Sequence, residues 1–271
     1  MTVLEDIIVG VTEDLDVRRR DLALEDLKAI ALSAPAARDA YAALGGDELP
    51  REQMRVIAEI KRKSPSKGAL AGISDPAALA EQYQDGGASV ISVLTEQRRF
   101  GGSLSDLDAV RERVSIPLLR KDFTVDEYQI WEARAHGADL ILLIVAALSD
   151  AKLREFLDLT HSLGMNALVE THTEDEIDRA VALGAKIIGV NVRNLKTLDV
   201  DRGIFASLAH RIPASAIVVA ESGVRSAQDV ADYASHGAHA VLVGEALVSD
   251  GKPAQRIAEF RAIGAQAMTS R

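Results

Sequence analysis

The chain has 271 residues, 48% of them hydrophobic and 27% charged, and its 31 basic and 41 acidic residues leave a formal net charge of -10. This composition is typical of a folded protein with a sizeable core and argues against disorder. The chain has no cysteine, which excludes disulfides, thiolate metal sites and a catalytic thiol, and its acidic balance opposes a nucleic-acid-binding surface.

The first part of the chain carries a helical pattern that is interrupted near Pro35 and ends at residues 44–46. We expect residues 1–50 to form an N-terminal helical extension that covers one end of the domain. The chain starts without a signal-peptide pattern, and its longest apolar run, residues 140–148, is too short to span a bilayer. We therefore expect a cytoplasmic protein with no membrane partner.

Eight short runs rich in Val, Ile and Leu follow, beginning at residues 55, 89, 116, 139, 165, 186, 216 and 239. Their starts lie roughly 21 to 34 residues apart, which leaves room for one helix and two turns in each interval. The runs are almost unbroken, which is typical of strands buried on both faces of a parallel sheet.

A weak internal repeat supports successive strand-helix units. Gly-Ala precedes four of the runs, at Gly87, Gly137, Gly184 and Gly237, and glycine is the usual residue just beyond the end of a helix. The pattern predicts an α/β fold in which residues 1–271 form a single (β/α)₈ barrel domain. The alternative is a doubly wound open sheet, which the lack of a G-x-G-x-x-G motif disfavours.

In such a barrel the functional site lies at the C-terminal ends of the strands. Polar side chains occur at these ends in the first, third, fifth, sixth and seventh runs: Glu59, Lys61, Lys121, Glu170, Asn191, Arg193, Glu221 and Ser222. Each one alone could equally be a solvated rim residue or a member of an ion pair. Together they would be costly to desolvate unless a charged ligand completed the pattern, so the set favours an anion-binding active site.

Glycines follow the last two strands, at Gly223 and Gly244, where backbone N–H groups can face a phosphate. Either could also be an ordinary turn residue. Lys61 and Ser64, in the basic stretch AEIKRKSPSKG, would face them across the closed barrel. We expect the other basic residues of that stretch to lie at the rim or in a loop: Arg62, Lys63 and Lys67.

Other charged residues suggest weaker hypotheses. Arg98 and Arg99 precede Phe100 in a segment that we interpret as a mobile loop able to close on a ligand, and the three arginines at 18–20 as a solvated helix face. His236 and His239 flank a helix-strand turn, but no third ligand is evident, so we expect no metal.

The motifs AEIKRKSPSKG, LTEQRRFGGS, LLRKDF, LVETH, GVNVRNL and VAESGV, in this order, resemble those of indole-3-glycerol phosphate synthase. The resemblance covers residues 50–250. It implies a (β/α)₈ barrel lyase of tryptophan biosynthesis that closes the indole ring of 1-(2-carboxyphenylamino)-1-deoxyribulose 5-phosphate, releasing CO₂ and water, without a cofactor. A small-molecule substrate is then the expected partner, and a monomer is our working expectation.

By the same resemblance, Lys121 is the general acid and Glu170 the general base, while Lys61, tuned by Glu59, contacts the substrate carboxylate. Asn191 and Glu221 orient the substrate. The remaining residues implied to bind substrate or phosphate are Ser64, Phe100, Arg193, Ser222, Gly223, Gly244 and Glu245. Glu245 departs from the family pattern, because a small hydroxyl residue would suit phosphate there and a carboxylate repels it.

Two other readings of these residues stay open. One is a different phosphosugar barrel enzyme, such as phosphoribosylanthranilate isomerase, which would need a cysteine that the chain lacks, or the tryptophan synthase α subunit. The other is a noncatalytic barrel that binds a phosphorylated metabolite, which would not explain why Lys121 and Glu170 face one ligand from different strands.

Overall fold

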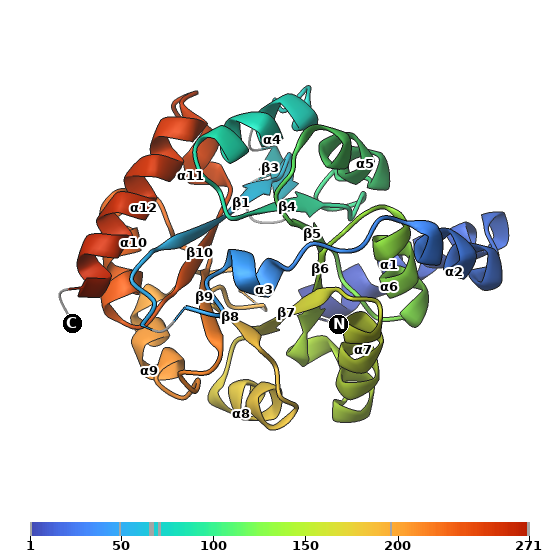
Figure 1. The fold of residues 1–271 in the computed structure, drawn as a ribbon. Coiled ribbons are helices and arrows are strands. Elements are labelled where there is room, and N and C mark those ends of the chain that lie inside the picture. Colours follow the sequence, from blue (N-terminus) through green and yellow to red (C-terminus); the bar gives the residue numbers. More distant parts are fainter. Residues whose placement is uncertain (1, 49, 65–67, 70–71, 196, 270–271) are drawn as a thin grey trace.

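The computed structural model describes residues 2–48, 50–64, 68–69, 72–195 and 197–269. Eight parallel strands close into a barrel in the order β1-β10-β9-β8-β7-β6-β5-β4 (Figure 1). Their bounds are β1 Arg55–Ile60, β4 Val90–Leu94, β5 Leu118–Lys121, β6 Leu140–Ile144, β7 Asn166–Thr171, β8 Ile187–Asn191, β9 Ile217–Glu221 and β10 Ala240–Val243. Each strand lies in one of the eight apolar runs, so the predicted (β/α)₈ fold is confirmed.

Helices alternate with the strands around the outside of the barrel (Figure 1). They are α4 Pro76–Asp85, α5 Leu104–Arg113, α6 Glu127–Ala135, α7 Asp150–Ser162, α8 Glu174–Ala182, α9 Phe205–Ala209, α10 Ala227–Ser235, α11 Glu245–Val248 and α12 Pro253–Thr269, with 3₁₀ turns at Val145–Ala147 and Arg202–Ile204. None of the helices in the described part of the chain has the length and apolar character needed to cross a membrane.

Local sequence signals explain where these helices start and stop. The side chains of Asp75, Ser149, Thr173 and Ser226 each accept a hydrogen bond from the backbone N–H three residues later, which caps α4, α7, α8 and α10. The repeated glycines at 87, 137, 184 and 237 have φ between +74° and +108°, a conformation that other residues rarely adopt. Each of them therefore reverses the chain between a helix and the next strand.

Side chains inside the barrel change from apolar to polar along the strands. A buried cluster near the strand starts includes Ile57, Val90, Leu119 and Leu168. Two residues further along β1, β5 and β7, on the same inward face, stand Glu59, Lys121 and Glu170. The apolar layer thus supports a charged layer at the C-terminal end.

The N-terminal extension contains α1 Val3–Asp21, α2 Leu24–Ser33 and α3 Ala40–Ala43. We expected it to cover one barrel end, but it reaches both. Ala40 belongs to the apolar cluster near the strand starts, and its N–H donates to Asn166 Oδ1 at 2.9 Å. Figure 1 shows α3 lying across this end of the barrel. Val3 and Leu4 of α1, in contrast, line a cavity at the opposite end.

The arginines at 18–20 are not simply a solvated face. Arg18 Nε donates to Glu132 Oε1 at 2.7 Å, and Glu132 is only 3% exposed. Arg19 pairs with Asp126, and only Arg20 fits the expectation of a solvated residue without qualification. Arg18 therefore anchors α1 to α6, which sequence periodicity could not reveal. The single-domain assignment stays a prediction.

Candidate active site

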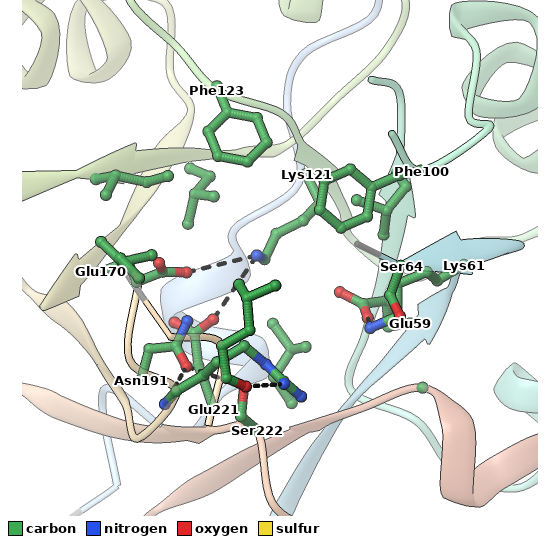
Figure 2. Close-up of a pocket in the computed structure, with 18 of the residues that line it drawn as sticks. Glu59, Lys61, Ser64, Phe100, Lys121, Phe123, Glu170, Asn191, Glu221 and Ser222 are labelled. Atoms are coloured by element: carbon green, nitrogen blue, oxygen red, sulfur yellow. Dashed lines mark hydrogen bonds and ion pairs between the residues drawn. The ribbon is translucent and has the colours of Figure 1, made fainter. Parts of the chain in front are cut away.

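A cavity of about 190 Å³ opens at the C-terminal end of the barrel. All thirteen residues singled out from the sequence line it: Glu59, Lys61, Ser64, Phe100, Lys121, Glu170, Asn191, Arg193, Glu221, Ser222, Gly223, Gly244 and Glu245. Figure 2 shows the labelled members of this set pointing toward a common space from several strands. Their proximity is thus a feature of the structure, whereas their chemical roles stay predictions.

Lys121 stands between two buried carboxyl groups (Figure 2). Its Nζ lies 3.5 Å from Glu170 Oε2 and 3.9 Å from Glu221 Oε2. The three side chains come from β5, β7 and β9, and their exposed fractions are 15%, 3% and 2%. One ammonium group therefore interacts electrostatically with two carboxyl groups that are almost fully buried.

Burial and neighbouring charges set the protonation of these groups. Burial lowers the pKa of Lys121, but Glu170, Glu221 and Glu59 raise it more, so the net pKa is raised. Burial raises the pKa of Glu170, but Lys121 and His172 bring it below its ordinary value. Burial and the charge of Glu170 both raise the pKa of Glu221. Of the two carboxyl groups, Glu221 is therefore the one that retains a proton more readily.

A second ion pair lines the same cavity as Lys121. Lys61 Nζ lies 2.5 Å from Glu59 Oε1, and Glu59 is buried. Burial raises the pKa of Glu59, but Lys61 and Lys121 lower it further, so Glu59 is ionised. Lys61 directly follows β1, so the two side chains that the resemblance links in function are in contact in the structure.

Two glycines provide space for the buried carboxyl groups. A Cβ on Gly189 would lie 2.0 Å from Glu221 Oε1, and one on Gly244 would lie 3.1 Å from Glu59 Oε1. Gly244 has a φ of -122°, which many residues adopt, so the turn that we considered for it does not require glycine. Its role beside Glu59 is steric, and the sequence held no signal for it.

The chain turns sharply after β9. Ser222 and Gly223 have φ values of +70° and +79°, and a serine in this region carries backbone strain of a kind found at functional sites. Ser222 Oγ donates to Asn191 Oδ1 at 2.9 Å, and Arg193 N donates to the same oxygen at 3.1 Å. Tyr233 OH donates to Ser222 O at 3.1 Å. This network orients the turn toward the cavity.

In the basic stretch after β1, Lys61 and Ser64 line the cavity and Lys63 does not, as the sequence predicted, but Arg62 differs from the prediction. Lys63 is exposed within a short antiparallel pair, β2 Lys63–Ser64 and β3 Gly68–Ala69. Arg62 is not a free rim residue, because its Nη2 donates to Asp106 Oδ1 at 2.9 Å and its Nε to Ile73 O at 3.1 Å. Lys67 lies outside the described residues.

One wall of the cavity was not foreseen from the sequence. Val3, Leu4 and Ile7 of α1 line it, together with Phe123 and the expected Phe100, whose rings lie 6.0 Å apart. The apolar residues of α1 recur at helical spacing, which could have suggested a buried face. Periodicity cannot say, however, what that face covers.

The segment after β4 holds α1 in place. Arg98 contacts Asp14 and Glu13, each at 2.6 Å, and Arg99 pairs with Asp6. The backbone N–H groups of the segment are themselves tied, since those of residues 98, 99 and 100 donate to the carboxylate of Glu96 at 2.7 to 3.0 Å. Closure of this segment on a ligand stays a prediction.

The histidines that we weighed as metal ligands have other partners. His239 Nδ1 accepts from Val218 N at 3.0 Å, and His236 Nδ1 lies 2.8 Å from Asp232 O. Within the described ranges no group of three or more His, Cys, Asp or Glu side chains could hold a metal ion. The expectation of a reaction without metal or cofactor stays a prediction.

Solved structures with a similar fold include 3-hexulose-6-phosphate synthase, with a TM-score of 0.63 and 20% identity over 78% of this chain and 99% of that one. Thiamine phosphate pyrophosphorylase from Pyrococcus furiosus has a TM-score of 0.59 and 14% identity over 82% and 100% of the two chains. At such low identity these likenesses concern the barrel fold alone.

Sequence relatives are far more similar. Indole-3-glycerol phosphate synthase from Arthrobacter sp. (strain FB24) is 70% identical over the full length of both chains. The protein of the same name from Micrococcus luteus is 62% identical over 97% of this chain and 98% of its own. The family model for indole-3-glycerol phosphate synthase matches residues 4–260. The chain therefore belongs to the indole-3-glycerol phosphate synthase family.

Proposed function

We propose that the chain converts 1-(2-carboxyphenylamino)-1-deoxyribulose 5-phosphate into indole-3-glycerol phosphate, CO₂ and water. The observation that carries this proposal, beside family membership, is the contact of the Lys121 ammonium with two buried carboxyl groups in a barrel-mouth cavity. The pKa of one, Glu170, is lowered, and that of the other, Glu221, is raised. Such a set offers an acid and a base to one substrate from different strands. A barrel that only binds its ligand would not need both.

Ring closure uses Lys121. The aromatic carbon that carries the carboxylate attacks the ketone carbon, and Lys121 donates a proton to the ketone oxygen as the new bond forms. Its positive charge also stabilises the negative charge that develops on that oxygen. Loss of CO₂ then restores the aromatic ring.

Dehydration uses Glu170. The new hydroxyl group takes a proton from one of the two lysines, Lys61 or a Lys121 that has regained its proton, and departs as water. Glu170 removes a proton from the substrate so that the indole double bond forms. A base must be ionised before it can act, and Lys121 and His172 hold Glu170 in that state. Glu221, whose raised pKa favours its neutral form, orients the substrate together with Asn191.

The remaining residues hold the anionic ends of the substrate. Lys61, paired with Glu59, contacts the benzoate carboxylate and is the second candidate for the proton donor. Phe100 packs against the substrate. The phosphate binds where strained backbone and polar side chains meet, between Ser64, Arg193, Ser222, Gly223, Gly244 and the backbone of Glu245. The exposed position of Glu245 allows its carboxylate to stay away from the phosphate.

The setting of the reaction follows from its chemistry. The partner is a small phosphorylated molecule, and no step of the reaction as written calls for a metal or an organic cofactor. We further propose that the enzyme acts in the cytoplasm as a monomer.

The test supplies the carboxyphenylamino-deoxyribulose phosphate and follows indole fluorescence for wild type, Lys121→Ala and Glu170→Gln. We expect turnover by wild type and a loss of about 10²-fold or more in kcat for each variant, because general acid-base catalysis typically contributes that much. Substrate binding without indole formation by folded wild-type protein would favour the noncatalytic reading. Full activity in both variants would refute the assigned roles.

A further inference from the structure

His172 contacts the proposed base from outside the cavity. It lies just after β7, and its Nε2 is 3.3 Å from Glu170 Oε1, whereas the other oxygen of Glu170 faces Lys121. The Nδ1 of His172 is 3.3 Å from Glu176 Oε2, and that oxygen also accepts the His172 backbone N–H at 2.7 Å. His172 is not among the described residues that line the cavity, so any effect on the reaction passes through Glu170.

These contacts favour the charged form of the ring. A neutral imidazole has one donor and one acceptor nitrogen, whereas the imidazolium has two donors. Both nitrogens of His172 face carboxylates, and an ionised carboxylate can only accept. Burial lowers the pKa of His172, but Glu170 and Glu176 raise it to about 9. The side chain is therefore a buried cation at neutral pH.

We propose that His172 is a positioning residue for the reaction: as an imidazolium braced by Glu176, it keeps Glu170 ionised and directs its second oxygen toward Lys121 and the substrate. The contact with Glu170 is mainly electrostatic. Nε2 lies at ion-pair distance but has no aligned hydrogen-bond partner among the described residues. The inference rests on the proposed role of Glu170 as the base.

Glu170 needs a second cation to stabilise its ionised form, because Lys121 also interacts with other carboxyl groups. Glu221 of β9 contacts the same ammonium, and Glu59 of β1 also acts on it electrostatically. When Lys121 donates its proton to the ketone, its charge is lost. His172 then remains in contact with Glu170 and keeps the carboxylate available for dehydration.

The decisive variant is His172→Gln, which keeps a polar side chain but removes the charge. Loss of a cation in contact with a carboxylate raises the carboxylate pKa by about 1 to 3 units. We therefore expect the acidic limb of the kcat-pH profile, measured at saturating substrate, to move to higher pH, with KM little changed. The loss of kcat should shrink as the pH rises.

A matched control and a rescue variant accompany it. His161→Gln changes an exposed histidine on α7 and should keep the wild-type profile. His172→Lys restores a cation and should return the acidic limb toward its wild-type position. If His172→Gln instead lowers kcat by the same factor at every pH, its role is structural and the inference is wrong.

A titration by nuclear magnetic resonance tests the charge without turnover. The imidazole signal of His172 in the wild-type enzyme should titrate near pH 9, and Glu176→Gln should move it to lower pH. Titration of the wild-type signal at an ordinary histidine pKa of about 6.5 would overturn the inference. Absence of indole formation by wild type would instead refute the proposed function, so the two failures are distinguishable.

Discussion

At the scale of single residues, two glutamates in contact with the same lysine have pKa values shifted in opposite directions. Glu170 is stabilised in its ionised form by Lys121 and His172, and Glu221 in its neutral form by burial beside Glu170. Glutamine has the shape of a protonated glutamate. A change to glutamine therefore imitates the neutral form that is favoured at Glu221, whereas at Glu170 it removes the ionised form.

This difference predicts that Glu221→Gln keeps kcat within about tenfold of wild type, whereas Glu170→Gln loses about 10²-fold or more. Steady-state indole formation at neutral pH measures both, and Glu221→Asp is the control for a change in side-chain length. Equal losses in the two glutamine variants would show that Glu221 is ionised in the working enzyme.

The positions of polar residues at the ends of the apolar runs were enough to predict that these side chains converge at the barrel mouth. They could not predict protonation, which depends on distances between residues far apart in the sequence. Nor could they identify Gly189, whose missing side chain leaves space for the Glu221 carboxyl group.

At the scale of elements, α1 forms part of the cavity wall and is held there by exposed ion pairs. Arg98 crosses α1 beside Gly10, where a Cβ would come within 3.1 Å of its Cδ. Exposed pairs are weak and are screened by salt, so α1 is attached less firmly than the strands are.

We predict that the double variant Arg98→Gln and Arg99→Gln raises KM by about 3- to 10-fold with little change in kcat, because the binding wall loosens while Lys121 and Glu170 stay in place. Steady-state kinetics at low and high salt provide the measurement, and salt should raise the wild-type KM toward that of the variant. Arg113→Gln is the control, since it breaks an exposed pair with Glu81 away from the cavity. An unchanged KM in the double variant would mean that α1 does not depend on these pairs.

The helical pattern and its interruption near Pro35 were visible in the sequence, but the position of the helices was not. Amphipathic spacing predicts that one face of a helix is buried, but it does not predict which surface packs against that face. The anchor between Arg18 and Glu132 joins residues 114 positions apart, a distance that local patterns do not bridge.

At the scale of the whole molecule, the barrel was predictable because eight apolar runs with helix caps and glycine turns specify it repeatedly. The N-terminal extension also covers the end of the barrel where the strands start, and the repeat does not predict this contact. Leu44 is 1% exposed and packs with the apolar layer inside the barrel, so it contributes to stability far from the site.

Leu44→Ala should lower the free energy of unfolding by about 2 to 5 kcal/mol, the usual cost of truncating a buried leucine. Denaturant unfolding measures this change. Leu32→Ala, which alters a leucine that is 72% exposed, should stay within about 0.5 kcal/mol of wild type. Equal free energies of unfolding for the two variants would show that the packing of Leu44 inside the barrel adds nothing to stability.

The attachment of the extension at both barrel ends also constrains the order of events during synthesis. The residues that receive α3 are made much later than α3 itself: Asn166 follows Ala40 by 126 positions, and Ser215, whose carbonyl accepts from Tyr41 OH, follows Tyr41 by 174. During synthesis α3 therefore has its complete docking surface only after residues up to Ser215 have been made. The extension can therefore dock fully only late in synthesis, after most of the barrel strands have been made.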